Sequence, residues 1–124
     1  QQIGIAGFST GGSIVLNAIY NYDADSRPDF VASMYPFGSL VKKKKLPGDA
    51  PQLFIATAAD DKLNAAANSS ISTYMVWSRA GKKADLHIYA NGGNFGMKEQ
   101  NTTSDRWFAD FIDWVNKLKL NKVD

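Results

Sequence analysis

The sequence predicts an α/β fold, with a parallel sheet of about four strands and helices on both faces of that sheet. Short apolar runs alternate with helical patterns in the order strand, helix, strand, loop, strand, helix, strand, helix, which is typical of parallel sheets. The run at 52–58 is apolar almost throughout, as expected of a strand that is covered on both faces. Polar or glycine-rich turns follow the apolar runs and mark where the strands end.

Composition limits the chain to one domain and excludes several classes of protein. The chain has 124 residues, 44% of them hydrophobic and 21% charged, which are ordinary proportions for a globular domain with a single core. No apolar stretch approaches the ~18 residues of a membrane span. The net charge is +2, and four of the 14 basic residues form the lysine run at 42–45, so the rest of the chain is close to balanced and offers no broad basic face for nucleic acid. We expect neither a membrane nor a nucleic-acid partner.

Residues that hold metals or cofactors are scarce. Cysteine is absent, which excludes disulfides and thiolate metal sites, and His87 is the single histidine. We expect no metal and no organic cofactor. The lysine run at 42–45 is typical of a solvated loop, and contact with an anionic surface or polymer is the alternative.

The chain begins within its first apolar run, with only Gln1 and Gln2 ahead of it. A natural domain seldom starts inside a strand, so we expect residues 1–124 to be a single domain that forms part of a longer protein. A leader peptide would lie outside such a piece, so its absence says nothing about the compartment.

The first twelve residues predict a strand, a tight turn and the start of a helix. Residues 7–11, Gly-Phe-Ser-Thr-Gly, fit the G-x-S-x-G pattern of a nucleophile elbow, in which a strained turn lifts a serine hydroxyl above the end of a sheet. We expect Gly7 and Gly11 to lie where two backbones approach too closely for a Cβ atom. A helical pattern from Gly11 to about Tyr20 supplies the context that the motif needs. The alternative is a glycine-rich turn without chemistry around Ser9.

The remaining elements follow in order along the chain. Strands are expected at 29–35, 52–58 and 84–90, and a helix of about four turns at 64–80. A last helix begins at about Thr102 or Thr103, either of which is a good N-cap. Its apolar side chains are expected to face the core: Trp107, Phe108, Phe111, Ile112, Val115 and Leu118.

Functional residues of open parallel sheets gather at the carboxyl ends of the strands. Three of the predicted ends carry candidate segments: Ser9, Asp60-Asp61 and Gly92-Gly93-Asn94. Because the carboxyl ends of parallel strands meet at one edge of a sheet, we expect these segments to lie along the same edge.

These segments resemble the C-terminal half of the alpha/beta-hydrolase fold, and within it the esterase branch that includes acetyl-xylan and feruloyl esterases and acetylesterase-like proteins. The family's elbow is usually Gly-Phe-Ser-Ala-Gly-Gly, which is close to residues 7–12 here. Residues 51–56 followed by the two aspartates resemble the strand and acid turn, and residues 86–89 with 92–97 resemble the last strand and the histidine loop. The order serine, acid, base is the order of that fold.

The resemblance implies roles for individual residues. Ser9 matches the nucleophile, and the backbone N–H of Thr10 matches one oxyanion donor. Asp61 matches the acid, because it falls where the second aspartate of a Gly-Thr-Asp-Asp-Pro type turn lies, and Asp60 is the less favoured candidate. Alanine and lysine replace the glycine and the proline of that turn, so a solvated acidic turn is the alternative.

The chain departs from the family at the base. The family loop is typically Gly-Gly-His-Gly-Phe-Gly, whereas residues 92–96 are Gly-Gly-Asn-Phe-Gly, which puts Asn94 at the histidine position. An amide does not accept a proton near neutral pH, whereas an imidazole with a pKa near ~6.5 does. His87 lies on the order of 16 Å below the end of its strand and is too far from Ser9 to replace it. We expect a strand histidine with satisfied hydrogen bonds, and a histidine from a neighbouring chain is the alternative base.

The resemblance also covers only part of the family's fold. The family's elbow strand is central, and a loop of the earlier strands supplies a further oxyanion N–H. Without those strands the first strand here would be an exposed apolar edge, which proteins normally cover. We expect a second copy of the chain, or an N-terminal segment, to cover that edge.

Three functions of different classes are compatible with these residues. The first is a serine carboxylic-ester hydrolase that acts on a small acyl ester or an acylated carbohydrate, weak or inactive because of Asn94. The second is a non-catalytic, degenerate relative that binds a ligand or a partner. The third is a flavodoxin-like or other doubly wound binding module, which leaves the likeness at 60–61 and 92–93 unexplained. The family likeness is compatible with a secreted or periplasmic protein, and the sequence does not decide the compartment.

Overall fold

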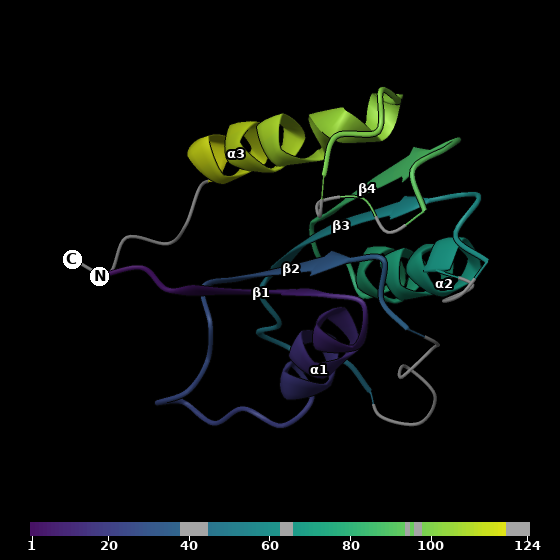
Figure 1. The fold of residues 1–124 in the computed structure, drawn as a ribbon. Helices are drawn as coiled ribbons and strands as arrows, with labels where there is room; N and C mark the ends of the chain where they lie inside the picture. Colours follow the sequence, from purple (N-terminus) through teal and green to yellow (C-terminus); the bar gives the residue numbers. More distant parts are fainter. Residues whose placement is uncertain (38–44, 63–65, 94, 96–97, 119–124) are drawn as a thin grey trace.

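Four parallel strands form one sheet. The structure is a computed structural model that describes residues 1–37, 45–62, 66–93, 95 and 98–118. The strands are β1 (Gly4–Phe8), β2 (Phe30–Met34), β3 (Gln52–Ala58) and β4 (Ala84–Tyr89), and they pair in the order β1-β2-β3-β4. Because every pair is parallel, all four carboxyl ends lie at the same edge of the sheet (Figure 1).

Helices cover both faces of the sheet. On one face α1 (Thr10–Ala18) contacts β1 and β2, and α2 (Ala66–Arg79) contacts β3 and β4. A 3-10 turn, η1 (Thr103–Arg106), leads into α3 (Trp107–Lys117), which crosses the opposite face (Figure 1). None of the helices in the described part of the chain is long and apolar enough to cross a membrane. The four-stranded parallel sheet with helices on both faces confirms the predicted fold class.

The predicted bounds agree closely with the observed ones. β3 has the bounds that the sequence predicts, and β2 and β4 lack only the outermost predicted residues. The N–H of Thr102 donates to the carboxylate of Asp105 at 3.3 Å, so Thr102 does begin the last helical segment. The predicted start of α2 at 64 and the lysines at 42–44 lie outside the described residues.

The core consists of two apolar layers, one on each face of the sheet. Alternate residues of β3 belong to opposite layers, since Leu53 and Ile55 pack with the side of α1 and α2, and Phe54 packs with the side of α3. All three side chains are fully buried. Trp77 of α2 is also fully buried and donates its indole N–H to the Pro51 carbonyl at 2.9 Å. This bond fixes α2 at the start of β3.

The prediction for the apolar side chains of α3 is wrong in part. Trp107, Phe111 and Trp114 pack against the core, whereas Phe108 and Ile112 are 56% and 40% exposed. The packed positions are four and three residues apart and so share one face of the helix. The exposed positions each follow a packed one, which turns them about 100° away from the sheet. Trp114, which the sequence analysis does not place in the core, packs there instead.

Among the strands that the structure describes, β1 is an edge strand, because β2 is its one pairing partner. Apolar side chains are exposed beside it: Ile3 ahead of the strand, Phe8 at its end and Ile14 on α1. An unpaired edge with apolar neighbours is a surface that proteins normally cover. The arrangement is the one that the sequence predicts for an isolated elbow strand.

Candidate active site

The segments singled out from the sequence follow three strands of one sheet. Ser9 follows β1, Asp60 and Asp61 follow β3, and Gly92 and Gly93 follow β4. β2 separates β1 from β3, so the strands that carry the serine and the aspartates are two strand spacings, ~10 Å, apart. A proton relay between the two strands therefore requires a bridging side chain.

Ser9 has the backbone conformation of a strained turn, with φ 53° and ψ −121°. Such a conformation costs ~1–3 kcal/mol and persists only where the surroundings fix it. The Ser9 N–H donates to the Met34 carbonyl at 2.9 Å, and the Ser9 carbonyl accepts from the N–H groups of Ser13 (3.2 Å) and Phe37 (3.3 Å). The adjacent strand and the first turn of α1 therefore hold the serine in place.

The elbow closes because positions 7 and 12 are glycines, whereas the sequence predicts Gly7 and Gly11 as the crowded positions. A Cβ on Gly7 would lie 2.2 Å from the carbonyl oxygen of Gly11, so Gly7 is required as predicted. The expectation for Gly11 itself is wrong, because a Cβ there would meet no atom within 4 Å. The second crowded position is Gly12, whose Cβ would lie 2.8 Å from Ser33 Oγ and 3.0 Å from the Met34 carbonyl oxygen. Gly12 lets α1 pack closely on β2.

Thr10 is the first residue of α1, directly after Ser9. The leading N–H groups of a helix have no partner within the helix, and they lie at the positive end of its dipole. Ser9, which is the N-cap residue, makes no side-chain capping bond to the helix. The N–H of Thr10 therefore lies at the positive end of α1, directly after Ser9.

Asp61 and Asp60 occupy different environments. Asp61 is only 6% exposed, and its N–H donates to the Ala58 carbonyl at 3.2 Å. Burial, with a further contribution from the negative charge of Asp61, raises the pKa of Tyr35, so the carboxylate lies near the residue that follows β2. Asp60 is exposed. Asp61 is thus the buried carboxylate of the pair.

Asp60 ties the turn after β3 to the loop after β4. Its Oδ1 accepts a hydrogen bond from the Gly93 N–H at 2.9 Å. This bond holds the pKa of Asp60 below its ordinary value, because the ionised carboxylate is the better acceptor. On the other side of the loop, Gln100 Nε2 donates to the Gly92 carbonyl at 2.6 Å, and a Cβ on Gly92 would lie 2.3 Å from Ser104 Oγ. The loop after β4 is therefore bonded to the turn after β3, and Gly92 lies close to Ser104 of η1.

Asn94, at the expected histidine position, lies outside the described residues. The next residue, Phe95, is fully buried and packs edge-on against Tyr35, with ring centroids 5.1 Å apart. Tyr35 in turn contacts the ring of Phe8 at 5.9 Å. A row of aromatic side chains thus connects the end of β1 with the loop after β4.

His87 does not lie with these residues. Strand pairing puts it in register with Phe8, three strands away, so ~14 Å of sheet separates it from the strand that precedes Ser9. It is distant as predicted, but the distance runs across the sheet, because β4 ends only two residues after it. Its Nδ1 lies 3.9 Å from Asp110 Oδ2 of α3, and its ring packs 5.0 Å from that of Phe54. His87 therefore helps to attach α3 to the sheet.

Sequence reasoning does not identify the part that Tyr35 plays at this edge. Tyr35 is buried, has a φ of 36°, and donates its N–H to the Ala56 carbonyl at 2.7 Å. The signal available is the Tyr35-Pro36 pair, which marks the end of β2 but not the neighbours of the ring. The bond between Asp60 and Gly93 spans 33 residues and has no local signature.

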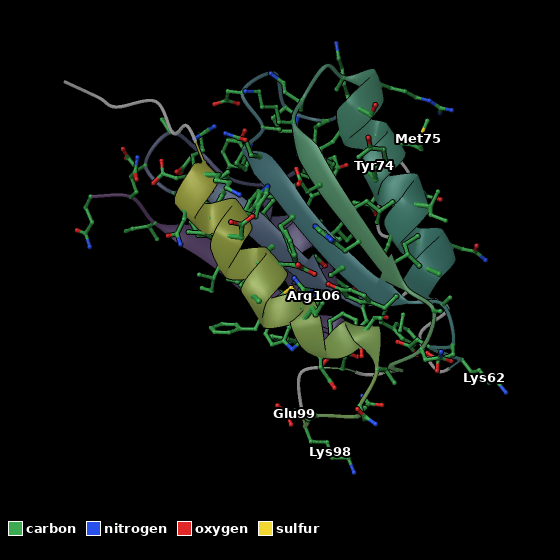
Figure 2. All side chains as sticks on the ribbon, turned by 90° about the horizontal axis from the view of Figure 1, so that it is seen from above. Lys62, Tyr74, Met75, Lys98, Glu99 and Arg106 are labelled. Atoms are coloured by element: carbon green, nitrogen blue, oxygen red, sulfur yellow. The ribbon has the colours of Figure 1, made fainter. Side chains whose placement is uncertain are left out.

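Charged side chains surround this end of the molecule. Lys62 extends from the turn after β3, and Lys98 and Glu99 extend from the loop after β4, away from the sheet (Figure 2). Within the described ranges, no group of three histidine, aspartate or glutamate side chains is arranged to hold a metal ion.

Comparison with known proteins identifies a remote relative. No family model matches the sequence. An acetylxylan esterase from Xylanibacter ruminicola is 27% identical over 156 residues, an alignment that covers all of this chain and 32% of that protein. The chain thus spans about a third of the length of the curated relative that it matches.

Solved structures share the fold. The acetyl ester-xyloside bifunctional hydrolase from Caldicellulosiruptor lactoaceticus superposes with a TM-score of 0.79 at 18% identity, over 91% of this chain and 55% of that chain. An alpha/beta hydrolase from a Medee basin deep-sea metagenome library superposes with a TM-score of 0.74 at 20% identity, over 92% and 53%. The predicted resemblance to alpha/beta-hydrolase-fold esterases is confirmed, and this chain covers about half of each of these two solved structures.

We predict that Gly7→Ala strongly destabilises the chain and that Gly11→Ala does not. The methyl group at Gly7 would overlap the Gly11 carbonyl, and overpacking of this kind costs at least ~1–3 kcal/mol. At Gly11 the methyl group meets open space, and alanine favours the helix by up to ~1 kcal/mol. Urea unfolding followed by circular dichroism measures the free energy of unfolding of both variants. Equal losses in the two variants would contradict the observed elbow.

We predict that the amide of Gly93 reports the ionisation of Asp60. A pKa that is lowered by folding contributes stability above the unfolded value, and this contribution is lost as the pH falls through the folded value. The bond to Gly93 should therefore persist from neutral pH to below ~3.9, the ordinary value for aspartate. An NMR titration of the Gly93 amide shift measures the midpoint.

Two substitutions control this titration, one at Asp60 and one at Asp23, which is also an exposed aspartate with a lowered pKa. Asp60→Asn should abolish the titration of the Gly93 amide, because the substitution removes the ionising acceptor. Asp23→Asn should leave it unchanged, because Asp23 bonds to Ser26 instead. A midpoint at or above ~3.9 would show that the bond does not favour the ionised carboxylate.

Proposed function

We propose that this chain carries the nucleophile of a serine carboxylic-ester hydrolase whose substrate is a small acyl ester or an acylated carbohydrate. The observation that carries the proposal is the strained backbone of Ser9 between β1 and α1, which is the conformation of a nucleophile elbow. The likeness to an acetylxylan esterase supports an acylated carbohydrate as the substrate.

In this proposal the reaction has two steps. Ser9 Oγ adds to the ester carbonyl carbon as its proton passes to a base, and the alcohol leaves with that proton, so that an acyl-serine remains. Water then adds to the acyl-serine by the same path and releases the acid. The Thr10 N–H stabilises the oxyanion, a contribution of ~3–4 kcal/mol for one such donor. Asp61 orients the base and stabilises its positive charge.

The base position limits the activity that we propose. Asn94 carries an amide, which is not basic near neutral pH. Loss of one triad member leaves ~10³–10⁴-fold acceleration over water, which comes from oxyanion stabilisation and binding. We therefore propose very weak hydrolysis for these 124 residues. Asn94 also favours the second candidate, a non-catalytic relative that binds a ligand or partner at the same edge.

Hydrolysis of p-nitrophenyl acetate distinguishes the two candidates. We predict a slow rate for the parent chain, loss of that rate in Ser9→Ala, and a rate at least about tenfold higher in Asn94→His, where an imidazole supplies the base. Ser72→Ala, which removes an exposed serine of α2, is the matched control and should keep the parent rate. Covalent labelling by a fluorophosphonate should likewise depend on Ser9 and not on Ser72. Rates equal to buffer for all variants would leave the non-catalytic candidate.

We also propose that the unpaired edge of β1 is covered in the working protein, by a second copy of the chain or by an N-terminal segment. The exposed Ile3 and Phe8 beside an unpaired strand support this proposal. If a second copy covers the edge, light scattering after gel filtration should give a dimer or larger species that dissociates on dilution. Ile3→Lys should shift the equilibrium to monomer, because a charge beside the edge opposes pairing. A monomer at high concentration would exclude the second copy.

A further inference from the structure

A groove of about 390 Å³ lies on the face of the sheet that carries α3, and it extends from the amino ends of β3 and β4 to His87. Its walls come from the first residues of β3 and β4, which include Gln52 and Asp85, and from the last turns of α3, which include Trp114. The lining reaches His87, which lies three strands, ~14 Å, across the sheet from the end of β1, so the groove does not reach Ser9.

The charged groups that α3 contributes to the groove are paired with neighbouring groups. Lys117 Nζ lies 2.8 Å from Asp113 Oδ1. Asp110 accepts a hydrogen bond from the Tyr89 hydroxyl at 2.6 Å, and the same carboxylate oxygen lies 3.9 Å from His87 Nδ1. The lining has three aspartates and two lysines, which gives a net charge near −1 with a neutral histidine. A strongly charged ligand of either sign therefore finds no matching field in the groove.

Trp114 supplies an aromatic surface among these polar groups. Its ring packs against Phe54 and Phe30, with centroids 5.4 and 5.8 Å apart, so the core holds its position. The side chain is only partly buried and also lines the groove. A fixed aromatic side chain beside several polar groups combines apolar contact with oriented hydrogen bonding.

The polar groups offer both donors and acceptors at short range. Lys83 and the amide of Gln52 donate, and the carboxylate of Asp85 accepts. A ligand with many hydroxyl groups can both donate to Asp85 and accept from Lys83, whereas an apolar ligand would displace water from these two exposed side chains without replacing its hydrogen bonds. The volume is at the small end of the ~300–1,000 Å³ range of ligand pockets.

We propose that this groove binds a neutral saccharide of one or two sugar units, with an apolar face of the sugar against Trp114 and its hydroxyl groups on Asp85 and Lys83. The choice of a xylose-based saccharide rests on the proposed function, whereas the shape and chemistry of the groove do not involve Ser9. The groove serves as a second contact for a carbohydrate chain in the esterase, or as the binding site of a non-catalytic relative.

The test is an NMR titration of the 124-residue chain carrying Ser9→Ala with xylobiose and with xylotetraose. We expect saturable binding in the millimolar range, with amide shifts confined to β4 and the last two turns of α3 and with a shift of the Trp114 indole N–H. Asp85→Ala should weaken binding about tenfold, because it removes an acceptor that is charged. Asp25→Ala, which removes an exposed carboxylate of the loop after α1, is the matched control and should leave binding unchanged.

Several results would overturn the proposal. They are the absence of shifts with either saccharide, shifts confined to the turn after β1, equal affinity in Asp85→Ala, and an equal response to spermidine, which is a polycation. Trp114→Phe keeps the packing against the core and should weaken binding, and thermal unfolding verifies that both variants are folded. Every titration uses a chain that lacks the Ser9 hydroxyl, so a failure to bind does not bear on hydrolysis. A negative esterase assay likewise does not change the expected result of the titration.

Discussion

The hydrogen bond from the Ser9 N–H to the Met34 carbonyl joins the elbow to β2, and the rest of the candidate site is arranged from that strand. On its other side β2 is joined to β3 by the bond from the Tyr35 N–H to the Ala56 carbonyl at 2.7 Å. The ends of β1 and β3 are therefore fixed relative to each other through one intervening strand. The strained turn at Ser9 persists because these bonds oppose its relaxation.

The sequence predicts elements well where local pattern and burial coincide. β3 is covered on both faces, so its apolar run and the turn after it define both bounds. α3 carries apolar residues around much of its circumference, so the pattern alone does not decide which of Trp107 and Phe108 faces the sheet. The rotation of that helix is set by packing, which the sequence does not show. Packing also explains why the expectation for Gly11 is wrong. The motif does not show which of the two adjacent glycines contacts β2, and it is Gly12.

The candidate site is predictable at the strand ends and not between them. Ser9 follows β1 directly and Asp61 lies in the turn after β3, so a local motif and the topology give their positions on the edge. The bond from Gly93 to Asp60 and the contact of Phe95 with the aromatic row join loops that are distant in sequence. Such contacts depend on strand register and loop length together, and a single sequence specifies neither one explicitly.

The two ends of the sheet have different physical requirements. The hydrolysis that we propose at the Ser9 end requires a base, and the unpaired edge of β1 is a separate liability, because exposed apolar edges promote association. The groove at the other end is shaped by β3, β4 and α3, which are held together by contacts of Tyr89 and His87 with Asp110. None of these contacts involves the elbow or the loop after β4. Binding at the groove therefore does not require an intact triad, and a chain with asparagine at position 94 retains every group that the groove uses.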